Sequence, residues 1–152
     1  MAAGDVNPVY VTPTSSTGGI TSLGTSSTWT AGYEWFVVDV AGMSPIPSRV
    51  RVSGQATVGT SPTSGTQIRV YLIASEDGST WPDVFDGTPS AETVTSEGVR
   101  DGFAKLAAVM PVGSTTSDRS YPFDFEASAF FNGSLPDTFA VFLAHNSGVN
   151  LN

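Results

Sequence analysis

Apolar and polar residues alternate most clearly between residues 49 and 58. Val or small residues occupy every second position there, and Arg, Ser, Gln and Thr occupy the positions between them. Successive side chains of a β-strand point to opposite faces of a sheet, so this pattern predicts a strand with one buried side. Residues 67–74 alternate in the same way after a loop of Gly, Pro, Ser and Thr. The two strands are predicted to pair as a hairpin with a long loop.

Three further segments have the pattern of strands. One lies just before this pair, and two lie in the last third of the chain. Residues 34–40 are a β-branched and aromatic run, and residues 138–144 are apolar on both faces, which is typical of a central strand. Residues 121–131 alternate, with Phe123, Phe125 and Ala127 on one face and Asp124 and Glu126 on the other. The Asn-Gly pair at 132–133 predicts the turn that follows.

The segment from 80 to 112 is harder to interpret. Residues 80–100 carry Pro, Gly, Asp and Thr without periodicity, which predicts a long surface loop. In residues 103–112, Phe103, Leu106 and Met110 would share one face of a helix, whereas Val109 and Pro111 suit a strand. The doubtful part of the chain is therefore 101–112, and the neighbouring strands favour a strand there.

These patterns predict an all-β protein: a single β-sandwich or jelly-roll-like domain of about eight strands over residues 33–152. Residues 1–32 predict an extended N-terminal arm, because they are rich in Thr, Ser and Gly and contain one charged residue, Asp5. Two short β-like pieces lie in the arm, at 9–11 and 20–23. The arm is either ordered against another surface or a flexible terminus.

Composition removes several classes of function. The chain of 152 residues carries a net charge of −8 and only six basic residues, which form no cluster, so we expect no nucleic-acid binding. It has no cysteine, which excludes thiolate chemistry and Cys-based metal sites. No stretch reaches the roughly 18 apolar residues of a membrane span, so we expect no membrane partner.

The search for catalytic groups finds no convincing set. His145 is the only histidine, and no Ser lies in a Gly-x-Ser-x-Gly turn. Asp124 and Glu126 share the outward face of a predicted strand, which favours two solvated residues over a paired acid and base. The acidic residues at 76, 77, 83 and 86 do not have the spacing of a calcium loop. We therefore predict no enzyme, no catalytic residue, no cofactor and no metal site.

Loop aromatics are the remaining candidates for binding. Trp29, Tyr33 and Trp81 lie in or beside predicted loops, where aromatic rings can stack on the apolar faces of sugars. The alternative is that they cover the ends of the sandwich core. The sequence leaves both interpretations open.

Two segments resemble small virion proteins of tailed bacteriophages. The first is Ser-Pro-Thr before a strand ending in Val-Tyr-Leu-Ile, at residues 60–73. The second is Leu-Pro-Asp-Thr-Phe before an apolar strand and then Asn-Ser-Gly-Val-Asn-Leu, at residues 135–151. The resemblance covers roughly residues 59–74 and 120–152, and its motifs are structural ones: a turn, a core strand and a turn.

The resemblance implies a non-enzymatic structural protein located in the virion. Its most specific form is a capsid decoration (cement) protein, a homo-oligomer that binds the major capsid protein or other virion proteins by apolar contact and strand addition, with the arm as a clamp. A tail or fibre component is the first alternative. A carbohydrate-binding β-sandwich module that uses the loop aromatics is the second.

Overall fold

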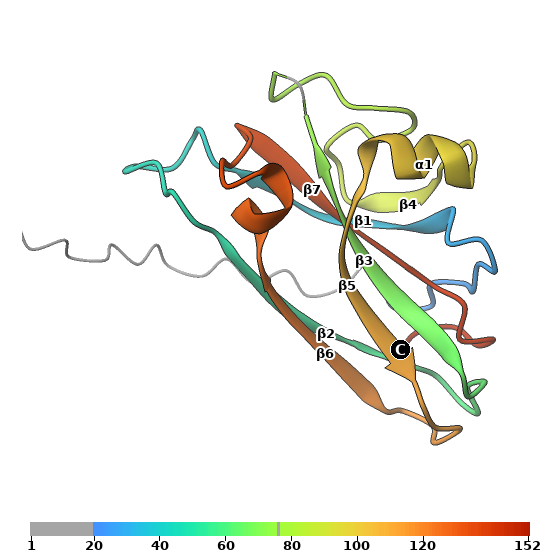
Figure 1. Ribbon diagram of the computed structural model, residues 1–152. Helices are drawn as coiled ribbons and strands as arrows, with labels where there is room; N and C mark the ends of the chain where they lie inside the picture. Colours follow the sequence, from blue (N-terminus) through green and yellow to red (C-terminus); the bar gives the residue numbers. More distant parts are fainter. Residues whose placement is uncertain (1–19, 76) are drawn as a thin grey trace, which may run out of the picture.

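Seven strands form two antiparallel sheets in the computed structural model, which describes residues 20–75 and 77–152. The five-stranded sheet has the order β4 (Ser90–Thr93), β1 (Ala31–Asp39), β7 (Thr138–His145), β3 (Thr66–Ala74) and β5 (Lys105–Val112). The two-stranded sheet pairs β2 (Arg51–Thr57) with β6 (Ser120–Glu126). Helix α1 (Glu97–Phe103) and the 3-10 helix η1 (Ala127–Phe131) complete the fold (Figure 1). The prediction of an all-β, sandwich-like fold is confirmed.

Strand β7 lies at the centre of the larger sheet. It pairs with β1 on one side and β3 on the other, and all eight of its residues are buried. Its apolar run from Phe139 to Ala144 is what a strand covered on both faces requires, because side chains on neither face reach water. The prediction of a central strand at 138–144 is confirmed.

The two faces of this sheet contact different apolar clusters. Ile68, Val70 and Leu72 of β3 join the cluster that fills the space between the two sheets. Tyr71 and Ile73 point the other way and join a second cluster. Phe85, Val94 and the end of α1 cover this cluster. The period of two along β3 therefore divides the strand between two cores.

The alternation at 49–58 is confirmed, but the predicted hairpin is wrong. Val52 and Ala56 are buried and Arg51, Ser53 and Gln55 are exposed, as the pattern predicts. However, β2 pairs with β6, 63 or more residues later in the chain, and β3 pairs with β5 and β7. The segment 59–65 crosses from one sheet to the other, where hydrogen bonds to residues 112, 147 and 150 hold it.

The predicted loop at 80–100 contains two elements, and this part of the prediction is wrong. Strand β4 pairs with β1, and α1 begins after Ser96, whose hydroxyl accepts the Val99 N–H. Helix α1 includes two glycines, which disfavour helix, so local propensity gave no signal. The strand favoured for the doubtful segment is confirmed as β5, while Phe103 ends α1.

Two other predicted strands differ in the structure. The strand at 121–131 ends at Glu126, and η1 follows it up to Asn132, which has φ 56°. The piece at 20–23 forms a turn rather than a strand, with the Leu23 N–H bonded to the Ile20 carbonyl. The piece at 9–11 lies outside the described residues, so seven strands are described where about eight were predicted.

The described part of the predicted arm packs against the domain. Ile20 and Leu23 are buried in the cluster between the sheets, and the N–H of Ser22 bonds to the Leu151 carbonyl. Strand β1 already begins at Ala31. Residues 20–30 therefore belong structurally with the sandwich, and residues 1–19 of the predicted arm lie outside the described residues.

Gly32 marks the tightest packing in the larger sheet and gives a test of it. A Cβ at this position would lie 2.4 Å from the Leu143 carbonyl oxygen and 2.5 Å from the Phe142 ring. We expect Gly32→Ala to lower the free energy of unfolding by about 3 kcal/mol, because backbone of the central strand cannot move aside. Gly98→Ala in α1, where nothing lies within 4 Å, should instead raise it by about 0.5 kcal/mol. Urea unfolding measures both, and equal effects would contradict this packing.

Candidate functional site

The three aromatic residues proposed for ligand stacking lie on opposite faces of the five-stranded sheet. Tyr33 packs against the cluster between the sheets, whereas Trp29 and Trp81 pack against the cluster on the other face. All three are partly buried. The structure therefore does not join them into one platform, and each contributes to the edge of a core.

Trp29 carries an arginine on its ring. The Arg69 guanidinium carbon lies 3.6 Å from the ring centre, a cation–π contact. Two nitrogens of Arg69 also donate to the Gln67 side-chain oxygen at 3.0 and 2.9 Å. These hydrogen bonds help to keep the guanidinium over the Trp29 ring. A sugar would need this ring face, so Arg69 would have to leave before Trp29 could stack on one.

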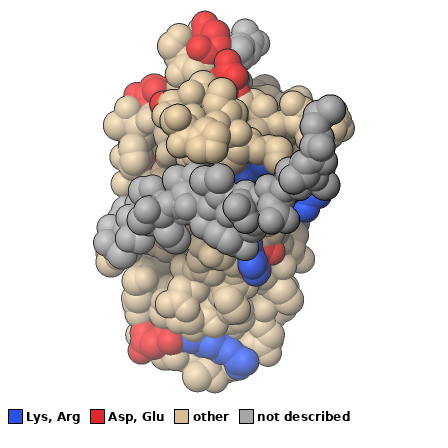
Figure 2. All heavy atoms as spheres, turned by 90° about the vertical axis from the view of Figure 1, so that its left-hand side faces the viewer, with Lys and Arg blue, Asp and Glu red and all other residues tan. Residues whose placement is uncertain are grey.

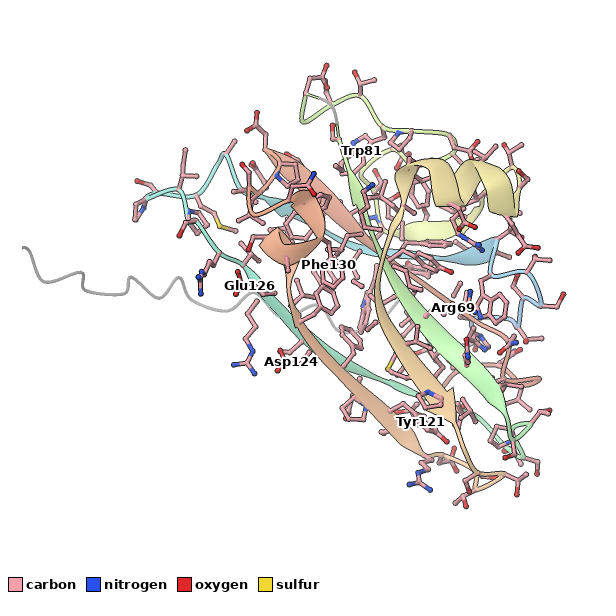
Figure 3. The ribbon with its side chains drawn as sticks, in the orientation of Figure 1. Arg69, Trp81, Tyr121, Asp124, Glu126 and Phe130 are labelled. Atoms are coloured by element: carbon pink, nitrogen blue, oxygen red, sulfur yellow. The ribbon has the colours of Figure 1, made fainter. Side chains whose placement is uncertain are left out.

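Trp81 holds its loop against the core. A Cβ at Gly87, where φ is +80°, would lie 2.8 Å from the Trp81 indole nitrogen. Gly87 is therefore needed both for its backbone conformation and for the close approach of the indole. Figure 3 shows Trp81 and Arg69 apart from each other, so Trp81 and the Arg69-covered Trp29 lie at different places on the same apolar cluster.

The carboxylates of β6 lie on the outward side of the two-stranded sheet, as predicted. Asp124 accepts from Nε of Arg51 at 2.7 Å and from its Nη2, and this contact lowers the pKa of Asp124. Glu126 lies 3.6 Å from Nε of Arg49. Both point away from the interior in Figure 3. These exposed ion pairs contribute little to stability, but they leave the outer face of this sheet locally neutral.

The loop carboxylates each hold a turn of their own. Asp77 accepts the N–H groups of Ser79 and Thr80, and these bonds lower its pKa. Asp83 accepts both the N–H and the hydroxyl of Thr95. Over residues 20–75 and 77–152, no three His, Asp or Glu side chains come close enough to hold a metal ion. Glu76, which belonged to the acidic set in the sequence, lies outside the described residues.

His145 connects the start of the described chain to the central strand. It is fully buried, and its Nε2 lies 3.0 Å from the Leu23 carbonyl oxygen. A carbonyl only accepts, so Nε2 carries the proton and Nδ1 faces Ser147 at 2.9 Å as an acceptor. Burial lowers the pKa of His145, which favours this neutral form. The position and contacts favour the structural role over a catalytic one.

Glu34 is a buried acid that sequence reasoning did not single out. It lies in β1 opposite Phe142, is completely shielded from solvent, and neither carboxyl oxygen has a hydrogen-bond partner of normal geometry among the described residues. Burial raises its pKa to about 7, the negative charges of Asp86 and Glu92 add to the rise, and nearby backbone N–H groups offset part of it. The only sequence signal was an acid, Glu34, at the start of an aromatic and β-branched run; the other acid of that strand, Asp39, lies at its end.

Arg100 is the second buried charge that the sequence did not reveal. From α1 it donates to the Thr28 carbonyl at 2.6 Å and the Trp29 carbonyl at 3.1 Å, and it pairs with Asp101. Its guanidinium lies 5.2 Å from the centre of the Tyr71 ring. Arg100 therefore fastens α1 to the turn before β1, and its charge serves the fold.

Concave surface is limited over the part of the chain that the structure describes. A shallow depression of about 240 Å³ lies between the loop after β1 and the segment before β7, with Ile46, Leu135 and Asp137 in its lining. A second, more open one of about 310 Å³ lies on the outer face of the two-stranded sheet, beside Arg51 and Asp124. Ligand pockets of about 300 Å³ or more are normally concave enough to bury most of a ligand's surface, which these open depressions do not do. No helix among residues 20–75 and 77–152 is long and apolar enough to cross a membrane.

Comparison with known proteins adds no relative: no family model, no curated protein and no solved structure matches this chain.

The buried carboxyl of Glu34 predicts an unusual dependence of stability on pH. Its folded pKa of about 7 lies above its ordinary value of 4.5, so its stabilising contribution is complete below about pH 4.5 and is lost as the pH rises through about 7. We expect the stability of Glu34→Gln relative to the natural chain to increase by about 2 to 3 kcal/mol between about pH 5 and about pH 8.

The difference between the two proteins is the quantity to measure, by urea unfolding at each pH. His145, whose pKa is lowered, titrates in an overlapping range with the opposite sign and cancels in that difference. A difference that stays constant with pH would contradict the position assigned to Glu34.

Proposed function

We propose that this chain is a non-enzymatic structural protein of a tailed-bacteriophage particle, and that it binds the capsid shell as a decoration protein. The proposal rests on the two segments that resemble small phage virion proteins, at 60–73 and 135–151. A tail or fibre position in the same particle is the alternative. The mechanism we propose is bracing: the protein bridges neighbouring shell subunits and opposes the outward pressure of packaged DNA.

The arrangement of the two resembling segments carries this proposal. They form neighbouring strands, β3 and β7, although more than 60 residues separate them in the sequence. The turn after β7 also binds the first segment: Asn146 donates its N–H to the Gln67 carbonyl at 3.0 Å and accepts the Gln67 N–H at 2.7 Å. The Thr63 N–H bonds to the Ser147 carbonyl. The resemblance therefore involves one continuous structural unit, which supports a shared fold.

The use of the buried polar groups also supports a binding and bracing role. His145 and Arg100 bond to backbone carbonyls of residues 23, 28 and 29, so their chemistry holds the N-terminal part of the described chain on the sandwich. What remains for function is the surface, the sheet edges and the residues before Ile20. An uncharged, Thr-rich segment such as 6–19 loses little hydration when it lies along another protein.

Particles of the phage that encodes this chain provide the direct test. Quantitative mass spectrometry of purified particles should find the protein at hundreds of copies, and image reconstruction should place its density on the outer surface of the shell. A few copies at one vertex would support the tail alternative. Absence from particles would contradict both forms of the proposal.

The N-terminal segment should carry the contact with the shell. We expect removal of residues 1–19 to weaken binding to undecorated particles by about tenfold or more, with an unchanged urea midpoint. The deletion stops at residue 19 because Ile20 and Leu23 are part of the core. A Gly/Ser segment of the same length should not restore binding. Full binding by the shortened chain would show that another surface is used.

A further inference from the structure

Among residues 20–75 and 77–152, strand β2 is unpaired from Arg51 to Gln55 on the side away from β6, and this edge lacks a Pro, a Lys or a bulge. Edge strands are normally protected by shortness, Pro, Lys or a bulge. Strand β4 has four residues. Strand β5 contains Lys105 and Pro111 and has a register shift opposite Val70 and Tyr71. Strand β6 contains Pro122 and lies beside β5. Strand β2 has no Pro and no Lys, and its register with β6 is unbroken over seven residues.

The hydrogen-bond pattern identifies which backbone groups of β2 point outward. Val58 donates to the Arg119 carbonyl and Val50 accepts from Ala127, so the even-numbered residues bond toward β6. In an antiparallel pair the direction alternates along the strand. The N–H and C=O groups of Arg51, Ser53 and Gln55 therefore face away from β6. No described residue bonds to them.

The far end of the same edge already accepts an antiparallel strand. Residue 151 bridges to Val58, the Asn152 N–H donates to the Thr57 carbonyl at 2.8 Å, and the Gly59 N–H donates to the Asn150 carbonyl at 2.9 Å. This pairing stops at Thr57. The backbone of β2 is thus shaped for a ladder on this side, and the part from Arg51 to Gln55 is the part left to a partner.

We propose that the partner is a second copy of this chain, paired through β2 about a two-fold axis to give a four-stranded sheet in the order β6-β2-β2-β6. Placing Ser53 opposite Ser53 of the other copy uses all three outward-facing residues. Arg51 then faces Gln55 across the axis on the outer side, and Val52 faces Gly54 on the inner side. No like charges are directly opposed, which is the condition for a favourable antiparallel pair. A two-fold contact of this kind is self-complementary and closed.

The charge around β2 favours a copy of the same chain, although the whole chain carries −8. Arg49 and Arg51 balance Glu126 and Asp124 on the outer face of the two-stranded sheet. Figure 2 views the molecule from the side on which β2 and β6 lie in Figure 1, and the charged groups visible there on described residues are of both signs. Two acidic molecules can therefore meet at this edge without strong local repulsion. The inference goes beyond the proposed function and does not depend on it.

A cysteine at position 53 tests the register directly, because the chain contains no other cysteine. Residues directly opposed in a hydrogen-bonded antiparallel pair have Cα atoms about 5.5 Å apart, which a disulfide can span. We expect Ser53→Cys in the full chain to form a disulfide-linked dimer under mild oxidation. Thr115→Cys, at an exposed site in the loop before β6, is the matched control and should form no disulfide-linked dimer under the same oxidation.

Charge changes at position 55 test the same register without cysteine. Gln55→Glu should tighten the dimer by about threefold to tenfold, because it faces Arg51 of the other copy, and Gln55→Arg should weaken it by a similar factor. Position 55 is exposed, so both variants should keep the urea midpoint of the natural chain. Sedimentation velocity over a range of concentrations measures the dissociation constants.

Three outcomes would overturn the proposal. The full chain could remain monomeric at all concentrations up to the millimolar range. It could dimerise with no cross-link at position 53 and no opposite response at position 55, which would place the interface elsewhere. It could also be monomeric and become dimeric only when residues 1–19 are removed, which would assign the edge to its own N-terminal segment.

Discussion

The burial of β7 on both faces is the constraint on which the rest of the structure depends. A strand with no solvent-facing side needs a neighbour on each edge and a cover on each face. Strands β1 and β3 supply the edges, the two-stranded sheet covers one face, and α1 with the loop around Phe85 covers the other. Burial of each Phe or Leu side chain of β7 contributes about 1.5 to 3 kcal/mol to the free energy of folding. The burial of these side chains therefore keeps the two-stranded sheet and α1 packed against β7.

Polar groups inside this arrangement connect segments that are distant in the sequence. His145 reaches Leu23, Arg100 reaches Thr28 and Trp29, and Asn146 reaches Gln67. Each of these side chains bonds to backbone, which would otherwise be buried without a partner. Glu34 differs, because its carboxyl is shielded without such a bond and is held in a form whose charge is disfavoured near neutral pH. The interior thus uses its few ionisable groups mainly to fix the chain path.

A β-sandwich of this kind exposes its chemistry at edges and ends. The three aromatic residues that the sequence offered for ligand stacking are already engaged in packing. Arg69 covers the ring of Trp29, Gly87 lies against the indole of Trp81, and Tyr33 packs against the core between the sheets. The outward carboxylates are neutralised by neighbouring arginines. Among residues 20–75 and 77–152, the backbone of β2 from Arg51 to Gln55 has no partner on the side away from β6. Such unpaired strand backbone is the kind of surface to which another strand can add.

Local patterns determined the strands, and tertiary contacts determined their partners. Alternation at 49–58 and the apolar run at 138–144 were sufficient for the all-β class, because side-chain direction along a strand is a local property. The pairing of β2 with β6, the helix α1 and the site of Glu34 could not be read in this way. Helix α1 contains Gly98 and Gly102, which disfavour a helix, and it depends on the hydrogen bonds of Arg100. The pairing of strands depends on which apolar faces meet across the core. The sequence by itself determined which residues are buried in most strands; the tertiary structure decided which strands are neighbours and which edge stays open.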